Sequence, residues 1–503
     1  MTFPWLTFLG LTPLLGAAVL CLPVRGVARG IGMFFAVATA VIGIAIAGPA
    51  AAGETFTERA PWIPAFGASW AVGLDGMALV MVLLTVLLVP VVLLAEWRIK
   101  TTGRWTAQAF FALVLALESL SIFTFIAEDV LLFYLFFEAT LIPMYFLIGG
   151  FGGPRRAYAA VKFLLFSLAG GLIMLASVIG LYVVSIGATG TPTYLLSELQ
   201  KIQLDPTVGR WLMVGFLIAF IVKAPMVPVH TWLPTATEEA TPGTSVLLVG
   251  ILDKIGTFGM IRFCLGLFPE ASTWVAPVMI GLALLSILYG AIAAIGSTHL
   301  LRLVAYTSIS HFGFMVLGIY TFTSVGISGS IFYMLNHGFS TAALFLVIGF
   351  LISRRGSAVV ADFGGVQKLA PVLSGVFLMA GLSGLALPGM SSFVSEFIVM
   401  AGAWSREPWV AAVASLGTVL AAVYILLMYQ RTMTGPVTPE VEKHFAVDAT
   451  GREKWVIGPL LAVILVLGIL PNIALTVIEP VAQQTLSITG VPDPVAPLGE
   501  EAK

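Results

Sequence analysis

The chain has 503 residues, of which 59% are hydrophobic and 10% are charged. Its mean hydropathy is +1.05, whereas about a quarter of the residues in a soluble domain are charged. This composition excludes a soluble enzyme, a secreted disulfide scaffold and a disordered chain. A net charge of −1 leaves no basic tail for nucleic acid. The sequence therefore indicates a polytopic membrane protein.

Predicted membrane spans follow from apolar windows of about 20 residues, the length of helix that crosses the hydrocarbon core. Polar segments at 49–73, 187–208 and 433–454 interrupt the series of windows, and none is long enough for a separate soluble domain. We expect an all-α polytopic membrane protein with about 14 transmembrane helices. They lie near 3–22, 27–48, 74–95, 105–126, 129–149, 157–186, 209–232, 242–266, 274–297, 300–321, 325–352, 369–402, 408–431 and 455–478.

Lysine and arginine residues set the expected direction of the spans. Fifteen of them follow odd-numbered spans, as Arg98 and Arg155 do, and five follow even-numbered spans. Because short cytoplasmic loops carry the excess of basic residues, both termini are expected on the outer side of the membrane. The two cysteines, Cys21 and Cys264, lie far apart in apolar stretches. We interpret them as packing residues that form no metal or iron–sulfur site by themselves.

Ionisable residues within the predicted spans need a reason, because a charge at membrane depth is costly unless it is paired or hydrated. Acids, lysines and histidines alternate over seven or more spans, which is the pattern that a proton relay needs. Two other interpretations remain: the charges can hold helices together as static ion pairs, and Lys162 can extend to the cytoplasmic surface. The residues are Glu118, Glu138, Lys162, Lys223, Asp253, Lys254, His311, His337 and Glu396.

Two predicted spans contain a break beside an ionisable residue. Pro225 closely follows Lys223 in the seventh span, and Pro388 precedes Glu396 in the twelfth. Proline lacks an amide donor and frees a carbonyl one turn back, and broken backbone at membrane depth lies beside protein or water. Each break therefore predicts a hydrated pocket next to a charge, with a simple kink as the alternative.

The two broken spans lie five spans apart in the chain. Units of five helices shifted by five spans cross the membrane in opposite directions, as in the inverted repeats of secondary transporters. We therefore expect two inverted five-helix repeats, at 105–266 (helices 4–8) and 274–431 (helices 9–13), each containing a broken helix. Residues 1–104 hold helices 1–3, and residues 432–503 hold a loop, helix 14 and an outer C-terminal tail.

Several long motifs occur in order between about residues 70 and 435: VKAPMVPVHTWLP, EEATPGTSVLLVGILDKIGTFGMIRF, AYTSISHFGFMVLG, NHGFSTAALF and ALPGMSSFVSEF. In these motifs the chain resembles the antiporter-like membrane subunits of proton-pumping NADH:quinone oxidoreductase (respiratory complex I). Chain M of that family has a glutamate in the twelfth span where its two paralogues have a lysine. This sequence has Glu396 at that position, in FVSEF, so it is similar to the chain M type.

The resemblance implies a role for each residue that matches a family motif. Glu138 would be the fifth-span glutamate, and Lys223 its seventh-span lysine partner. Lys254 would be the central lysine of the eighth span, and Glu396 the distal acid that exchanges protons with the outside.

Four further residues match the family pattern. His311 and His337 match the histidines that bridge the two halves, Glu118 matches a fourth-span glutamate facing a neighbouring subunit, and His230 matches a histidine near the cytoplasmic surface. The sequence also departs from the pattern: Asp253 precedes Lys254 where the family is usually apolar, and LPTAT replaces LPDAH. The first departure can change the charge of the central site, and the second can change proton uptake.

Together these residues predict proton translocation. A buried lysine favours its neutral form and a nearby glutamate reverses that preference, so approach and separation of Glu138 and Lys223 would hold and release a proton. Moving one charge against 100 mV costs about 2.3 kcal/mol, and this sequence contains no nucleotide, flavin or metal-cluster motif to supply it. The resemblance implies that NADH, FMN, iron–sulfur clusters and quinone belong to partner subunits, with no cofactor in this chain.

The resemblance also implies an assembly in the bacterial plasma membrane. The expected partners are other membrane and peripheral subunits of complex I, including two paralogous antiporter-like subunits, and lipids, but no nucleic acid. Three alternatives remain: a subunit of a multisubunit cation/proton antiporter, a subunit of a membrane-bound energy-converting hydrogenase, and a structural scaffold without a proton path. Copurification with iron–sulfur and flavin subunits would distinguish complex I from the antiporter.

Overall fold

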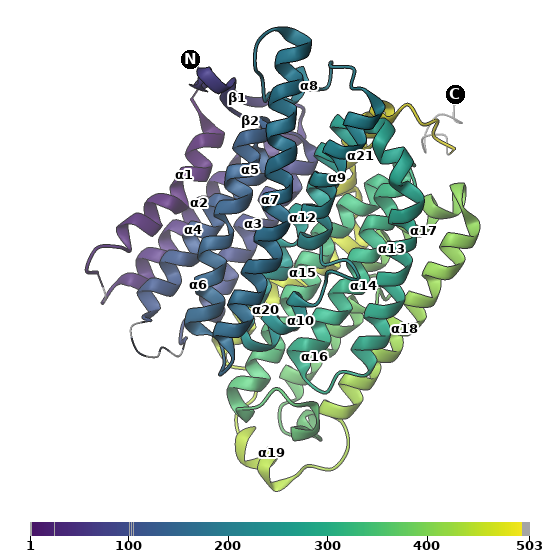
Figure 1. The fold of residues 1–503 in the computed structure, drawn as a ribbon. Coiled ribbons are helices and arrows are strands. Elements are labelled where there is room, and N and C mark those ends of the chain that lie inside the picture. Colours follow the sequence, from purple (N-terminus) through teal and green to yellow (C-terminus); the bar gives the residue numbers. More distant parts are fainter. Residues whose placement is uncertain (1–2, 25, 100, 102, 104, 495–503) are drawn as a thin grey trace.

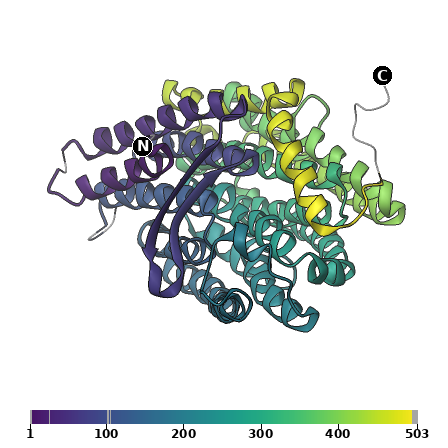
Figure 2. The same ribbon diagram turned by 90° about the horizontal axis from the view of Figure 1, so that it is seen from above.

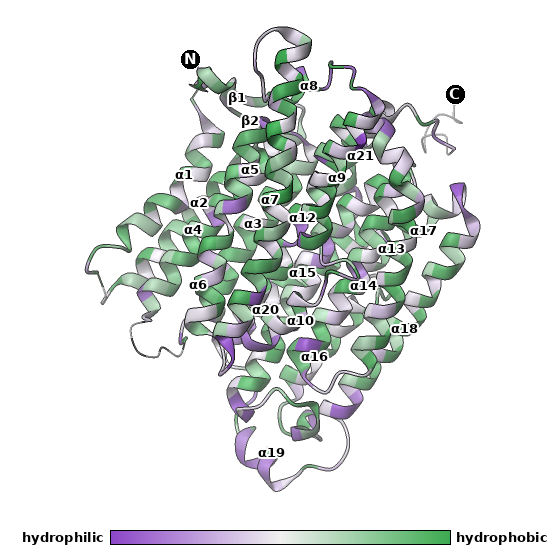
Figure 3. Ribbon diagram, viewed as in Figure 1, coloured by the Kyte–Doolittle hydropathy of each residue, from purple (hydrophilic) through white to green (hydrophobic). Residues whose placement is uncertain are grey.

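The computed structural model describes residues 3–24, 26–99, 101, 103 and 105–494. Its helices run side by side along one direction, and the first and last described residues lie at the same end of the bundle (Figure 1). Apolar residues predominate along the helices, and polar residues gather toward the two ends of the bundle (Figure 3). This is the arrangement of a helical membrane protein, as predicted. Residues 495–503 of the predicted outer tail lie outside the described residues.

All of the predicted spans coincide with helical segments. Within the described part of the chain, 11 helices are long and apolar enough to cross a membrane, or up to 13 when each bent pair counts as one span. Including the shorter apolar helix α1 raises the number to the predicted fourteen. The helices in this part of the chain are α1 (Trp5–Val19), α2 (Ala28–Ala51), α3 (Gly76–Ala95), α4 (Ala107–Ile126), α5 (Val130–Ala139), α6 (Leu141–Phe151), α7 (Arg156–Thr189), α8 (Leu196–Leu199), α9 (Pro206–Lys223), α10 (Trp232–Glu239), α11 (Pro242–Leu247), α12 (Lys254–Gly259), α13 (Pro269–Ile295), α14 (Leu300–Tyr320), α15 (Ser324–Arg355), α16 (Pro371–Gly384), α17 (Ser391–Arg406), α18 (Pro408–Met433), α19 (Pro439–His444), α20 (Gly451–Ile469) and α21 (Asn472–Thr489).

The polar segment between α2 and α3 forms an antiparallel hairpin, β1 (Phe56–Ile63) and β2 (Ala68–Leu74), which the sequence does not predict. Seen from above, the hairpin lies across the ends of the helices (Figure 2). The carboxylate of Glu58 in β1 accepts hydrogen bonds from the backbone N–H groups of Leu6 (2.6 Å) and Thr7 (3.1 Å). These are amides of the first turn of α1 that have no partner within the helix, so the hairpin caps α1.

Both predicted breaks are confirmed. α9 ends at Lys223, and α10 does not begin until Trp232. α16 ends at Gly384 and α17 begins at Ser391, seven residues later. In the second break the chain turns through a left-handed conformation at Gly389 (φ 92°), which favours glycine because it has no Cβ.

The eighth span departs from regular α-helix, which the sequence does not predict. Two π-helical segments, Leu248–Leu252 and Met260–Leu265, flank the six residues of α12. Single π turns in helices are frequent at functional sites because they change which backbone carbonyls are free. The first π segment lies directly before Asp253 and Lys254.

Burial divides the spans into an inner and an outer set. In the most apolar 18-residue stretch of each span, the share of buried residues is 100% for the span 242–265 and 89% for α14 and α15. It is only 28% for α2. Large apolar side chains of α2, α7 and α18, such as Phe34, Leu165 and Val419, are exposed. These outer helices therefore face lipid, and the inner helices are shielded from it.

The end of α15 is fixed by one ion pair. Arg354 donates two hydrogen bonds to the carboxylate of Glu453 in the first turn of α20, at 2.7 and 2.8 Å. The side chains are only 11% and 6% exposed. Arg354 also donates to the backbone carbonyls of Phe350 and Asp448, so it joins α15 to the loop that precedes α20.

We expect Arg354→Ala to lower the free energy of unfolding by about 3–5 kcal/mol, because it leaves the Glu453 carboxylate buried without its partner. The measurement is thermal unfolding of the purified protein in detergent. Arg210→Ala is the control, since the Arg210–Glu270 pair is 40% and 55% exposed and such surface pairs contribute about 0–1 kcal/mol. Equal melting temperatures for the two variants would contradict the expectation.

Candidate functional site

Five of the predicted relay residues are buried within the helix bundle. Lys223, Lys254, His337 and Glu396 are at most 3% exposed, and His311 is 7% exposed. They come from α9, α12, α14, α15 and α17, which brings together segments far apart in the sequence. The arrangement has two ends, at Glu138 and Glu396, and a centre at Lys254.

At the first end, Glu138 lies near the end of α5 and Lys223 is the last residue of α9. The two side chains interact electrostatically. The Lys223 Nζ lies 5.1 Å from the centre of the Phe137 ring and 5.8 Å from that of Phe163, so aromatic faces stabilise its positive charge. Within the described residues, neither Lys223 Nζ nor Glu138 Oε1 has a hydrogen-bond partner.

Gly171 of α7 belongs to this end of the site, although the sequence gives no sign of it. A Cβ atom at Gly171 would overlap the carboxylate of Glu138. Only glycine leaves the space that Glu138 occupies. In the sequence, Gly171 looks like any other glycine in a membrane helix, so only its packing against Glu138 identifies it.

At the centre, Lys254 is held by two acceptors. Its Nζ donates to the carbonyl oxygen of Val249 (2.7 Å) and to Nδ1 of His337 (2.6 Å). The Val249 carbonyl is free because the backbone N–H of Asp253 bonds to Leu248, five residues back, in the π segment. The irregular winding of the eighth span thus supplies a ligand for the central ammonium group.

Beyond Lys254 the contacts continue through aromatic and hydroxyl groups. The ring centres of His337 and His311 lie 5.1 Å apart, and His311 Nε2 lies 3.2 Å from the hydroxyl oxygen of Tyr424. Tyr333 packs against His311 at 5.8 Å between ring centres and donates a 2.9 Å hydrogen bond to Glu396. The structure therefore links the predicted Lys254, His337, His311 and Glu396 in one series.

Two tyrosines and a threonine complete the distal end, and none of them is predicted from the sequence. Tyr333 and Thr418 each donate to one oxygen of the Glu396 carboxylate, and Tyr424 contacts His311. Hydroxyl groups buried in apolar spans are the available signal, because they need partners. That signal is weak, since threonine can also bond to its own helix backbone.

The structure places three predicted ionisable residues outside this series. Glu118 on α4 is 1% exposed, and both of its carboxylate oxygens lack a partner among the described residues. This chain alone encloses it, although the resemblance implies that it faces a neighbouring subunit. His230 lies in the break between α9 and α10, with its ring 4.9 Å from that of Tyr289. Lys162 donates to Thr235 of α10, at 3.0 Å.

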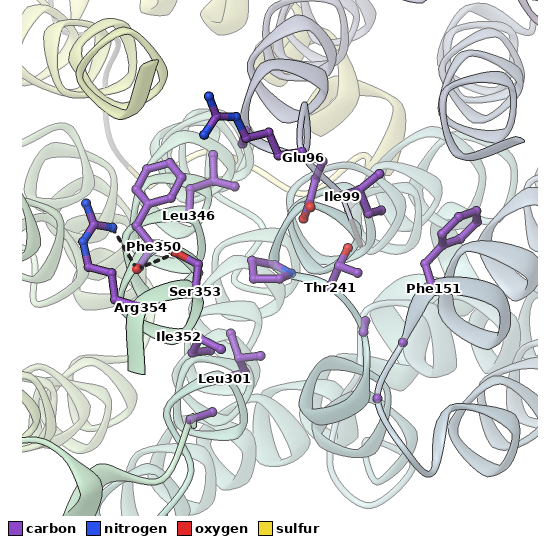
Figure 4. A pocket seen from close by; sticks show the side chains of 18 of the residues that line it. Glu96, Ile99, Phe151, Thr241, Leu301, Leu346, Phe350, Ile352, Ser353 and Arg354 are labelled. Carbon is purple, nitrogen blue, oxygen red and sulfur yellow. Dashed lines mark hydrogen bonds between the residues drawn. The ribbon is translucent and has the colours of Figure 1, made fainter. Parts of the chain in front are cut away.

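A cavity of about 1040 Å³ opens at the ends of α3, α10 and α15. Its polar lining includes Glu96, Arg98, His299 and Arg452 but none of the eight predicted site residues. The side chains of Glu96 and Thr241 point toward each other across this space (Figure 4). Burial raises the pKa of Glu96, although the N–H of Gly243 donates to its carboxylate. The cavity is therefore a polar, open pocket at the end of the bundle where the basic loops lie.

Comparison with known proteins identifies the family. The family described as NADH:quinone oxidoreductase/Mrp antiporter, TM, matches residues 127–421. NADH-quinone oxidoreductase subunit M of Mycobacterium tuberculosis is 47% identical over 98% of this chain and 95% of its own length. The chain belongs to the NADH-quinone oxidoreductase subunit M family. The predicted chain M type is therefore confirmed.

Solved structures agree with this assignment. A chain of respiratory complex I from Thermus thermophilus with bound NADH superimposes with a TM-score of 0.89 at 31% identity, over 97% of this chain and 100% of that chain. A chain of the Mrp complex from Dietzia sp. DQ12-45-1b gives a TM-score of 0.85 at 23% identity, over 97% and 99% of the two chains, which shows a shared fold. As a subunit M, the chain is an antiporter-like, proton-translocating membrane subunit of respiratory complex I.

We expect Gly171→Ala to impair the subunit by displacing the Glu138 carboxylate from its place beside α7. The measurement is proton pumping by the assembled complex in liposomes, normalised to NADH oxidation. Gly187→Ala on the same helix is the control, because a Cβ at Gly187 has nothing within 4 Å. The expectation fails if both variants pump like the parent complex.

Proposed function

We propose that this subunit moves protons across the bacterial plasma membrane along the series that begins at Glu138 and Lys223. The series continues through Lys254, His337 and His311 and ends at Glu396. The observation that carries the proposal is the contact series itself. From Lys254 to Glu396, neighbouring titratable or hydroxyl groups are bonded or in ring contact inside an apolar bundle.

The first step depends on the pair at the broken α9. Burial favours the neutral form of a lysine, and a carboxylate nearby restores its charge. Lys223 lies where regular helix ends, so a small change of backbone can alter its distance from Glu138. When the two groups are close, Lys223 keeps its proton. When they separate, the proton leaves toward Lys254.

The later steps use the existing contacts. The Lys254 ammonium donates directly to Nδ1 of His337, so a proton transferred along that bond leaves a neutral amine. His337 Nε2 and His311 Nδ1 have no partner in the described residues, and the two rings are in edge-to-face contact with their centres 5.1 Å apart. In this proposal a water molecule bonded to both nitrogens completes this step. The hydroxyls of Tyr424 and Tyr333 contact His311 and position Glu396, which receives the proton and releases it outward.

The energy for these steps comes from the partner subunits in this proposal. There NADH is oxidised and quinone reduced, with FMN and iron–sulfur clusters as carriers. The partners in the membrane include two paralogous antiporter-like subunits and lipids. Both termini lie on the outer side. This accords with the basic loops at the opposite end of the bundle and with the first and last described residues, which lie at one end of it (Figure 1). The repeats 105–266 and 274–431 are the two halves of the path.

The two remaining predicted residues, His230 and Glu118, lie outside the contact series, and each has a role beside the path. His230 lies at the break, edge-on to Tyr289 and within the electrostatic field of Lys162, which suits uptake from the cytoplasmic side. Glu118 is a buried acid on the side of the N-terminal helices. In this proposal it transmits charge between the path and the adjoining subunit through its own protonation.

We expect Glu138→Gln and Lys223→Ala to reduce proton pumping by about tenfold or more, since each removes a proton-carrying group whose loss typically costs 10²–10⁴ in a transfer step. The measurement is the proton gradient formed by the assembled complex in liposomes per NADH oxidised. Glu270→Gln is the control, because Glu270 is an exposed acid paired with Arg210. Pumping at the parent stoichiometry in either site variant would refute the path.

We expect Tyr333→Phe to slow pumping less than Glu396→Gln does. The phenylalanine removes one of two hydrogen bonds to the carboxylate and leaves the bond from Thr418, whereas the glutamine removes the exchangeable proton itself. The same liposome assay compares the two variants. Equal losses would show that the tyrosine hydroxyl carries the proton and does more than position Glu396.

A further inference from the structure

Asp253 is a buried acid between the two lysines of the site, and the path described above gives it no role. It is 0% exposed, and neither carboxylate oxygen has a hydrogen-bond partner within the described residues. An isolated buried carboxylate is costly unless it is protonated, paired or hydrated. Its position therefore needs a functional or structural reason.

The packing of α12 against α9 shows where Asp253 lies. A Cβ at Gly259 would meet the ring of Phe220, and a Cβ at Gly256 would lie 2.6 Å from the backbone nitrogen of Ala224. The two helices are thus antiparallel along this face, because the α9 residue number rises as the α12 number falls. Asp253 is the next residue on the same face, three before Gly256, and so lies against the start of the break after Lys223.

Electrostatics agree with this placement. Asp253 interacts with both Lys223 and Lys254. With Glu138 included, acids and amines alternate along the first half of the site: Glu138, Lys223, Asp253, Lys254. Each amine then has an acid beside it, so the charge on either lysine is balanced in the low-dielectric interior.

Asp253 is not fixed in a static ion pair. The described residues contain no ion pair within 4.0 Å that joins it to a lysine. The Lys254 ammonium is instead bonded to Val249 and His337. The Lys223 Nζ and both Asp253 oxygens are free to take new partners, as a group that accepts and releases protons requires.

We propose that Asp253 carries the proton between the two lysines. In the first step the Lys223 ammonium gives a proton to the Asp253 carboxylate, which leaves a neutral amine and a neutral acid. In the second step the Asp253 carboxyl gives that proton to neutral Lys254, which restores the carboxylate and forms the ammonium that faces His337. The net charge is unchanged in each step. The inference rests on the proposed proton path and adds one group to it.

The test compares three variants of the assembled complex in liposomes. Asp253→Asn keeps the size and polarity of the side chain but cannot carry the proton, so pumping per NADH oxidised should fall about tenfold. Asp253→Glu restores the acid and should recover most of the pumping, with an altered pH profile. Thr257→Val is the control: it removes a buried hydroxyl one turn away, which bonds to Met334 and to the backbone carbonyl of Lys254 but carries no titratable proton, and should pump normally.

The outcomes separate this inference from the path itself. If Glu138→Gln and Lys223→Ala lose pumping while Asp253→Asn keeps the parent rate and pH profile, the path stands and the role of Asp253 is refuted. If none of the three loses pumping, both are refuted. Equal losses in Asp253→Asn and Asp253→Glu with an unchanged pH profile would also overturn the inference, because only the fit of the side chain would matter. If Asp253→Asn does not assemble, the smaller Asp253→Ser provides the same comparison.

Discussion

The cost of charge in an apolar interior governs this structure. Acids, amines and imidazoles that would be strongly hydrated in water lie here among membrane helices. The fold limits that cost by placing Lys254, His311 and His337 on spans that are almost fully buried, and by surrounding these spans with outer helices whose apolar side chains face lipid. Both lysines of the site also have an aromatic face within reach, Lys223 in Phe137 and Lys254 in Phe312.

Irregular backbone is the second means by which the protein stabilises these groups. Regular helix satisfies its own backbone groups and leaves few carbonyls for a buried ammonium. The breaks after Lys223 and before Ser391, together with the π segment at 248–252, provide free backbone groups at membrane depth. The charged residues and the irregularities therefore occur together, because each would be unfavourable alone.

The sequence predicted much of this arrangement. Hydropathy located the spans because a membrane helix must be apolar over its whole length, and proline marked both breaks because it cannot complete the helical hydrogen bonds. The motifs identified Lys254, His337 and Glu396. Gly171, Tyr424 and Thr418 were missed because their roles depend on contacts between distant helices, which no local pattern encodes.

The hairpin and the π segments were missed for a different reason. β1 and β2 are stabilised by pairing with each other and by Glu58 at the start of α1, in a stretch whose prolines and glycines resemble a loop. The π turns contain ordinary apolar residues such as Val249 and Ile251. Their winding follows from tertiary packing and from the bond to Lys254, and so composition alone could not distinguish them from α-helix.

The π segment also couples the shape of the eighth span to the ionisation of its lysine. If this turn rewound to α geometry, the N–H of Asp253 would bond to Val249 in place of Leu248 and take the carbonyl from the Lys254 ammonium. A neutral amine loses less by that exchange than a charged one. By thermodynamic reciprocity, any strain that tightens the coil favours discharge of the amine, and discharge in turn favours the tighter coil, so a mechanical displacement and a chemical event become two expressions of one equilibrium.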